Sequence, residues 1–308
     1  MDIILVAHRI VSVFLVLGLA PLFVGLVNKQ KAIFTGRAGA GIFQPYYDLK
    51  RILRKETIRA HNASFISSIS PVINLIALVT AAAMLPNGFS RPLISFEGDI
   101  ILFAYMLGLA RFFQILAAMD IGSSFEGMGA AREATFAVFA EPIFFFTLGS
   151  IAFISGLTSI YEIFYSIRLD NVSYIIFIVV CSISVFILAV TECSRMPVDD
   201  PNTHLELTMI HEVMILDNSG VDLFLYQYSS YVKLFIYAIL EASFFYPFSV
   251  QSYTAGVIIF IVVIVMLSAA LATVETVASR FKMINIPHYL LFATAIGILN
   301  LLIYTFTK

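Results

Sequence analysis

The segment YTAGVIIFIVVIVMLSAALATVETV (Tyr253–Val277) decides the fold class of this protein. It contains a single charged residue, Glu275, close to its C-terminal end. A transmembrane α-helix needs about 20 consecutive, mainly apolar residues, and this segment is longer than that. Only helices and closed barrels satisfy all their backbone hydrogen bonds in lipid. The segment is therefore predicted to cross a bilayer as an α-helix.

The composition of the whole chain agrees with a membrane protein. Its 308 residues are 60% hydrophobic and 12% charged, with a mean hydropathy of +0.95. A soluble domain is usually about 25% charged. A soluble fold of this length could not bury so much apolar surface. The formal net charge of −2 gives no indication of a nucleic-acid partner.

Seven further segments resemble the first in length and apolar character. We therefore predict an all-α polytopic membrane protein, a single membrane domain over residues 1–308, with about eight transmembrane helices and amphipathic helices in its cytoplasmic loops. The predicted spans are approximately Ile3–Val27, Phe65–Leu85, Ile100–Met119, Gly129–Gly156, Val172–Val190, Tyr226–Tyr246, Tyr253–Val277 and Pro287–Phe306.

The basic residues are concentrated in alternate loops. The loop between the first two spans holds eight Lys and Arg residues, and the opposite loops hold few. Because basic loops tend to remain in the cytoplasm, we place loops 28–64, 120–128, 191–225 and 278–286 there. The protein is then expected in the plasma (inner) membrane, with both termini outside.

The loop GRAGAGIFQPYYDLKRILRKE (Gly36–Glu56) changes character at Pro45. Beyond that residue, apolar residues recur every three or four positions with basic residues between them, which predicts an amphipathic helix. Such a helix either anchors to anionic lipid or docks a cytoplasmic partner, and the residues alone leave both open. The predicted docking residues are Gly39, Gly41, Gln44, Pro45, Asp48, Lys50 and Arg51.

Several charged residues fall within the predicted spans, where they are costly and usually functional. Glu133 and Glu141 lie in the fourth span, and Lys233 and Glu241 lie in the sixth. We interpret the carboxylates and Lys233 as steps of a proton relay, in which Lys233 is either a counter-charge or a switchable cation, and Arg111 has a similar role as a structural or switching partner. The alternative is a static ion pair, for example of Glu133 with Arg111 or Arg132. Glu275 is expected at the water interface.

The segment TECSRMPVDDPNTHLELTMIHEVMILDNSG (Thr191–Gly220) gathers three Asp, three Glu, two His and one Arg between two apolar spans. Its two prolines predict a turn. The apolar periodicity of Leu205–Leu216 then predicts a helix, capped by Asn202 or Thr203. We expect Glu192 to pair with Arg195. The acidic residues suggest a proton path, with a solvated or partner-binding loop as the alternative.

Metal or redox chemistry within this chain is not indicated. His204 and His211 are seven residues apart, and no HExxH motif is present. Cys181 and Cys193 are twelve residues apart and match neither an iron–sulfur nor a zinc pattern. We therefore predict no metal site and no cofactor in this chain.

Three long blocks carry a resemblance to a known family. GRAGAGIFQPYYDLKRILRKE, ARFFQILAAMDIGSSFEGMGAAREATFAVFAEP (Ala110–Pro142) and the Thr191–Gly220 segment resemble the NuoH family of complex I membrane subunits. They also resemble its relatives in energy-converting nickel–iron hydrogenases and formate hydrogenlyases. Glu141–Pro142 and HLELTMIHE are closer to the hydrogenase branch. CSRMPVDDP departs from the pattern of the quinone branch, and DNSG stands where EYSG is expected.

The resemblance implies a membrane-anchoring, ion-coupling subunit that is not catalytic alone. Its partners would be a peripheral arm, with iron–sulfur clusters and either a nickel–iron centre or a quinone-reducing site, and antiporter-like membrane subunits. The matching relay positions are Glu133, Glu141, Glu192, Glu206, Glu212 and Asp217, and Arg132, Arg195 and Asp199 would be structural or switching partners. The alternatives are a quinone-binding NuoH subunit and a stand-alone secondary transporter.

Overall fold

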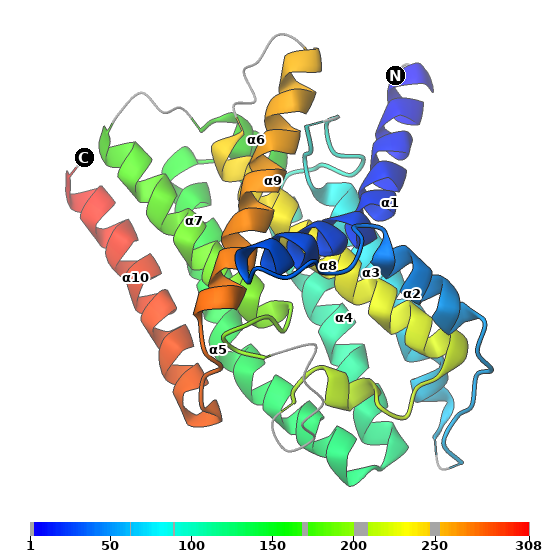
Figure 1. Cartoon of the computed structure of the whole chain (residues 1–308). Coiled ribbons are helices and arrows are strands. Elements are labelled where there is room, and N and C mark those ends of the chain that lie inside the picture. Colours follow the sequence, from blue (N-terminus) through cyan, green and yellow to red (C-terminus); the bar gives the residue numbers. More distant parts are fainter. Residues whose placement is uncertain are drawn as a thin grey trace.

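The structure, a computed structural model, describes residues 3–61, 63–88, 90–167, 172–199, 209–246 and 253–307. The described residues are nearly all helical and form no strand. Eight helices are long and apolar enough to cross a membrane, which confirms the predicted fold class. They are α1 (Ile3–Phe34), α3 (Phe65–Met84), α4 (Asp99–Ile121), α5 (Ser124–Ser155), α7 (Val172–Glu192), α8 (Gly220–Phe245), α9 (Tyr253–Val277) and α10 (Ile286–Thr307) (Figure 1). The short helices are α2 (Gln44–Leu53), α6 (Ile160–Tyr165), η1 (Glu212–Ile215) and η2 (Met283–Asn285).

Helix α8 occupies the centre of the bundle. It packs against α1, α2, α3, α7 and α9. Every residue from Val232 to Phe244 is buried. A helix that is buried on all sides must satisfy its polar side chains within the protein. The two charged residues of this stretch, Lys233 and Glu241, are therefore committed to internal partners.

Helix α1 contains Pro21 and bends along its length (Figure 1). Proline has no amide hydrogen, so the carbonyl of Leu17 loses its partner four residues later. The hydroxyl of Tyr228 on α8 donates to that carbonyl at 3.0 Å. The hydroxyl of Tyr46 on α2 donates to the neighbouring carbonyl of Gly18. Tyrosines from two other helices thus supply hydrogen bonds to the carbonyls of α1 near Pro21.

The predicted amphipathic loop helix is present as α2. Pro45 and Leu49 are buried, while Lys50 and Arg51 are exposed. Asp48 is half-buried and lies 3.5 Å from the guanidinium of Arg51. Of the remaining predicted docking residues, the exposed ones are Gly39, Gly41 and Gln44. Pro45 is therefore part of the packing of α2 and is not accessible to a partner.

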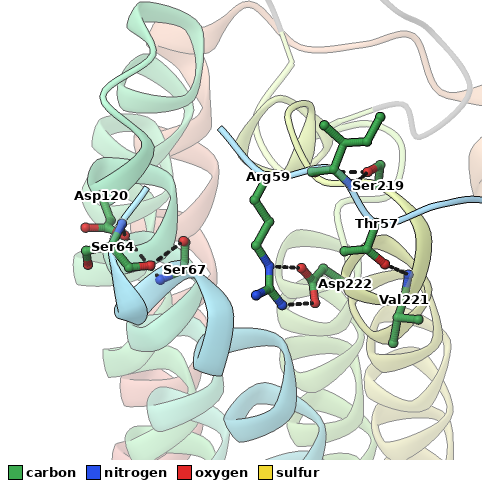
Figure 2. Close-up of polar contacts among 9 residues, drawn as sticks. Thr57, Arg59, Ser64, Ser67, Asp120, Ser219, Val221 and Asp222 are labelled. Carbon is green, nitrogen blue, oxygen red and sulfur yellow. Dashed lines mark hydrogen bonds and ion pairs between the residues drawn. The ribbon is translucent and has the colours of Figure 1, made fainter. Parts of the chain in front are cut away.

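The connection between α2 and α3 is fastened to the start of α8 (Figure 2). The guanidinium of Arg59 donates to both carboxylate oxygens of Asp222, at 2.8 and 3.2 Å. Asp222 is buried. The hydroxyl of Ser219 accepts from the amide of Ile58 at 2.7 Å and donates to its carbonyl at 3.0 Å. These contacts fix the first loop against the segment that precedes α8.

The predicted helix Leu205–Leu216 is wrong over its described part. Residues 209–211 are not helical, and Glu212–Ile215 form a short 3-10 helix. The carboxylate of Asp199 accepts from the amides of Ile210 and His211, and Arg132 donates to the carbonyl of Met209. Side chains thus take the backbone groups that an α-helix would use. The proposed caps Asn202 and Thr203, together with His204 and Glu206, lie outside the described residues.

We expect Gly25→Ala in α1 to destabilise the protein by about 1–3 kcal/mol. A Cβ atom at Gly25 would overlap the backbone carbonyl of Ile42, which cannot move aside as a flexible side chain could. Gly18 is the matched control, because a Cβ atom there meets no heavy atom within 4 Å. Thermal unfolding in detergent, followed by circular dichroism, measures the difference. Equal midpoints for the two variants would show that the close approach of α1 to the loop is absent.

Candidate ion-relay site

Three buried charged residues from three helices meet inside the bundle. The carboxylate of Glu192, the last residue of α7, lies 2.9 Å from the guanidinium of Arg111 on α4. Its other oxygen lies 2.9 Å from the ammonium group of Lys233 on α8. Arg111, Glu192 and Lys233 are 9%, 6% and 8% exposed. The predicted pairing of Glu192 with Arg195 is wrong, because Glu192 is occupied by these two cations.

The cluster formed by Arg111, Glu192 and Lys233, hereafter the central cluster, has one anion and two cations. The excess positive charge attracts further carboxylates. Glu141 on α5 lies 3.8 Å from a second nitrogen of Arg111, and its side chain is 56% exposed on the flank of the chain. Glu133, two turns earlier on α5, lines a pocket together with Arg111 and Glu192. Arg111 thus connects a buried carboxylate with one that reaches the surface.

Three pockets meet at the guanidinium of Arg111. The first, with a cavity volume of about 80 Å³, lies between α4, α5, α7 and α8 and is also lined by Glu141 and Glu192. The second, of about 10 Å³, reaches Glu133 and the turn that follows α7. The third, of about 10 Å³, reaches His211 and Lys233. A water molecule that binds in these pockets would bond to their charged side chains.

His211 lies beside the central cluster, in the segment that precedes η1. The amide nitrogen of Gln114 is 3.4 Å from each of its ring nitrogens. Burial, followed by the positive charge of Lys233, lowers the pKa of His211 to about 4, against an opposing effect of Glu192. The imidazole is therefore neutral at physiological pH and can both accept and donate a proton. The predicted relay did not include this residue.

A second ion cluster lies around Glu275 on α9. Its carboxylate is 3.0 Å from the ammonium group of Lys31 and 3.2 Å from the guanidinium of Arg195. Glu275 is 5% exposed, so the expected place at the water interface is wrong. Lys31 of α1 and Arg195, which follows α7, both contact the carboxylate of Glu275. Arg195 therefore ties α9 to the turn and is not the partner of Glu192.

The same turn is held by Asp199. Its carboxylate lies 2.6 Å from the guanidinium of Arg280, which follows α9. The amide of Phe281 donates to the carbonyl of Pro197 at 2.8 Å. Arg132 fixes the neighbouring carbonyl of Met209 at 2.8 Å. Arg132 and Asp199, predicted as structural or switching partners, thus hold the backbone of the loop in place.

The remaining predicted relay residues lie apart from the central cluster. Glu212 is half-buried in η1, and Asp217 is exposed. The amide of Asp217 donates to the carboxylate of Glu126 at 3.0 Å, and Glu126 is fully buried at the start of α5. Glu241 lies two helical turns beyond Lys233 on α8 and contacts the hydroxyl of Ser182. Glu206 is outside the described residues.

Metal ligands are not gathered in the part of the chain that the structure describes. Within it, no group of three or more His, Cys, Asp or Glu side chains is arranged to hold a metal ion. Cys181 and Cys193 are both free thiols. The described site consists of charge-paired side chains, most of them buried.

Comparison with known proteins gives a consistent set of relatives. The model of the NADH dehydrogenase family matches residues 7–305. Hydrogenase-4 component C of Escherichia coli K12 is 28% identical over 79% of this chain and 76% of its own length. Formate hydrogenlyase subunit 4 of the same organism is 24% identical over 84% of each chain. The NuoH subunit of the NADH-quinone oxidoreductase of Salinibacter ruber is 24% identical over 73% of this chain and 66% of its own.

A solved structure has the same fold. A chain of the membrane-bound sulfane sulfur reductase, an archaeal respiratory membrane complex, superimposes with a TM-score of 0.79. The superposition covers 97% of this chain and 98% of that one, at 19% sequence identity. At this identity the likeness concerns the arrangement of helices alone.

Replacement of Glu275 with Gln is expected to lower the free energy of unfolding by about 3 kcal/mol, because it leaves Arg195 buried without its counter-charge. Glu56→Gln, at an exposed position of the first loop, is the control and should change it by less than about 0.5 kcal/mol. Denaturant unfolding in detergent measures both. Similar values would mean that Arg195 has another anion beside it.

The pKa of His211 makes stability depend on pH. The unfolded state binds a proton near pH 6.5, whereas the folded state does so only near pH 4, so the free energy of unfolding falls as pH is lowered through this window. Between pH 6.5 and pH 4, we expect the free energy of unfolding of His211→Gln to fall by up to about 3 kcal/mol less than that of the unaltered protein. The exposed His61 provides the control, and His61→Gln should retain the dependence. Unfolding measured at both ends of the window tests the difference.

Proposed function

The chain belongs to the NADH dehydrogenase family, and from this premise we propose that it is the membrane-anchoring, ion-coupling subunit of a complex I-like respiratory or hydrogenase complex. It docks a peripheral redox arm and passes redox-driven change to ion translocation. Electrons travel in the partner subunits, through iron–sulfur clusters and a nickel–iron centre or a quinone. The names of two relatives, from a hydrogenase and a formate hydrogenlyase, support the hydrogenase branch.

The observation that carries the proposal is the link from the central cluster to Glu141. A charged side chain exposed to hydrocarbon near the middle of a span costs about 2.5–3.5 kcal/mol or more. Glu141 is exposed in this chain, at 56% of its side chain, although it lies within a span. A polar surface of a neighbouring membrane subunit would remove this cost. We therefore assign the flank of α5 around Glu141 to the interface with an antiporter-like partner.

The geometry supports a relay based on competition for Arg111. An arginine remains protonated, so it acts here as a fixed positive charge and not as a proton carrier. Its guanidinium is 2.9 Å from Glu192 and 3.8 Å from Glu141. When Glu141 takes up a proton, Arg111 interacts with Glu192 alone. When Glu141 releases the proton to the neighbouring subunit, the guanidinium is shared again.

The entry side of the relay faces the loop that precedes α8. Neutral His211 and Gln114 line the same pocket as Lys233, and the buried carboxylate of Glu126 contacts the backbone of Asp217. A change in the docked arm that shifts this loop would alter the distance between His211 and the central cluster. Protons would then enter through His211 and water and reach Glu192 and Glu141. The carboxylates could also bind sodium ions, and the test below distinguishes the two ions.

The position in the cell follows the same proposal. The protein is a multi-pass membrane protein, with eight helices suited to spanning. We propose that it lies in the plasma membrane with its basic loops in the cytoplasm. The exposed Lys50 and Arg51 of α2 would then face the peripheral arm.

A quinone-binding role is the second candidate. Helices α1, α8 and α9 line an apolar groove with a cavity volume of about 240 Å³, which includes Phe23, Phe235 and Ile264, and a prenyl tail would fit such a surface. The relative from Salinibacter ruber carries the name of a quinone oxidoreductase subunit. Photolabelling of the intact complex with a quinone analogue tests this role. Label at these residues supports it, and an unlabelled active complex removes it.

Replacement of Glu141 or Glu192 with Gln is expected to lower the number of ions moved per electron, because each substitution removes an ionisable group from the proposed path. The redox rate and co-purification of the cysteine-rich partner subunits should persist. The measurement is uptake of protons and of sodium ions by proteoliposomes that hold the intact complex. The ion whose uptake is lost in the variants, proton or sodium, is the ion that the relay carries.

The exposed Glu97, in the loop before α4, supplies the control, and Glu97→Gln should translocate normally. Unchanged translocation in both Glu141→Gln and Glu192→Gln would remove the central cluster from the ion path. Loss of the partner subunits from the purified complex would instead indicate that the two acids act in assembly.

A further inference from the structure

Glu241 is a buried carboxylate that the relay through Glu141 does not use. It is 4% exposed, near the end of α8. One oxygen accepts a hydrogen bond from the hydroxyl of Ser182 on α7. The other oxygen, Oε2, is buried and has no hydrogen-bond partner among the described residues. An isolated ionised carboxylate in apolar surroundings is very costly, so Glu241 holds a proton at rest.

The side chain of Glu241 lines a pocket between α1, α7, α8 and α9. The cavity volume of the pocket is about 30 Å³, and Glu241 and Tyr237 are the polar residues among an otherwise apolar lining that includes Phe23, Leu234 and Leu271. It is separate from the three pockets that meet at Arg111. A protonatable group in a small cavity with an unsatisfied oxygen is a place where a water molecule can bind.

The side chain of Tyr237 lies between this pocket and the central cluster. Its side chain lines the pocket of Glu241 and also the pocket that contains Arg111, Glu141 and Glu192. Tyr237 is 3% exposed, so its hydroxyl is inside the protein. A phenol both donates and accepts a hydrogen bond and can therefore pass a proton from one side to the other.

The spacing on α8 places the three groups in a row. Lys233, Tyr237 and Glu241 follow at intervals of four residues and thus lie on one face of the helix. With a rise of 1.5 Å per residue, each step is about 6 Å along the axis, which one water molecule can bridge. Glu241 lies four residues, or about 6 Å, before Phe245, where α8 ends on the side opposite Gly220.

We propose that Glu241 is the terminal proton carrier of a second branch of the relay, which runs from the central cluster through Tyr237 to the far end of α8 within this chain. The inference rests on the ion-coupling function proposed above. The ligand that Glu241 binds and releases in this branch is the proton. The branch requires no residue of a neighbouring subunit, in contrast to the route through Glu141.

The proton transfers balance in three steps. Glu241 first releases its proton towards the far end of α8 and becomes a carboxylate. Tyr237 then gives its hydroxyl proton to Glu241 and takes one from the ammonium group of Lys233, directly or through water. Lys233 recovers its proton from the side of His211. Tyr237 and Glu241 end as they began, and one proton has crossed.

The test uses the intact complex in proteoliposomes and two readouts. The first is the number of protons moved per electron. The second is the infrared absorption of protonated buried carboxyl groups, recorded as a difference between resting and turning-over enzyme. The variants are Glu241→Gln and Tyr237→Phe, which retains the ring and its packing. Glu162→Gln is the control, because Glu162 is exposed in α6.

We expect a partial loss of translocation, at an unchanged redox rate, in both Glu241→Gln and Tyr237→Phe, and none in Glu162→Gln. One carboxyl band should change during turnover in the unaltered complex and be missing in Glu241→Gln. In Tyr237→Phe the band should be present but no longer change. This last result separates a carrier from a carboxyl group that only supports the packing of α7 and α8.

A band that is constant during turnover, or normal translocation in both variants, would overturn the branch. The variants of Glu192 and Glu141 test the proposed function separately from the branch. Normal translocation in Glu241→Gln together with its loss in Glu192→Gln would leave the relay standing without this branch. Normal translocation in both Glu192→Gln and Glu141→Gln would remove the relay and, with it, the branch.

Discussion

The bridging of Arg111 and Lys233 by the single carboxylate of Glu192 is the constraint around which this protein is built. Three helices, α4, α7 and α8, each contribute one charged group, and all three groups are buried. Removal of one member of such a buried set typically costs about 3–5 kcal/mol, because the others are left uncompensated. The set is also unbalanced, with two cations to one anion. That imbalance explains why further carboxylates, Glu133 and Glu141, border the same pockets.

The loops that surround the central cluster are secured by charge as well. Glu275 joins Lys31 and Arg195, and Asp199 joins Arg280. These pairs connect α1, the turn after α7, and the end of α9, three parts of the chain that are distant in sequence. The backbone near His211 is consequently positioned from several sides. In the function proposed above, movement of a docked partner changes the charge state of the site, and this requires a firmly located segment beside the ionisable groups.

The sequence was sufficient for the fold and for the identity of most charged groups, but not for their pairing. Eight spans follow from hydropathy, since a lipid-exposed helix has few alternatives. Glu192 and Arg195 are neighbours in sequence, yet α7 ends at Glu192 and the next residues turn away towards Glu275. The apolar repeat at Leu205–Leu216 did not anticipate that Asp199 and Arg132 would take the backbone groups of Met209 to His211. Glu275 lies near a helix end, where exposure is the usual outcome, and only the folded chain brings Lys31 over it. Such long-range partners are set by tertiary packing, which no local pattern records.

The proline in α1 has a mechanical consequence. Because the carbonyls of Leu17 and Gly18 bond to Tyr228 and Tyr46, the three helices α1, α2 and α8 are joined at one place. A displacement of α2 would therefore reach both the bend of α1 and α8, the helix that carries Lys233 at its middle.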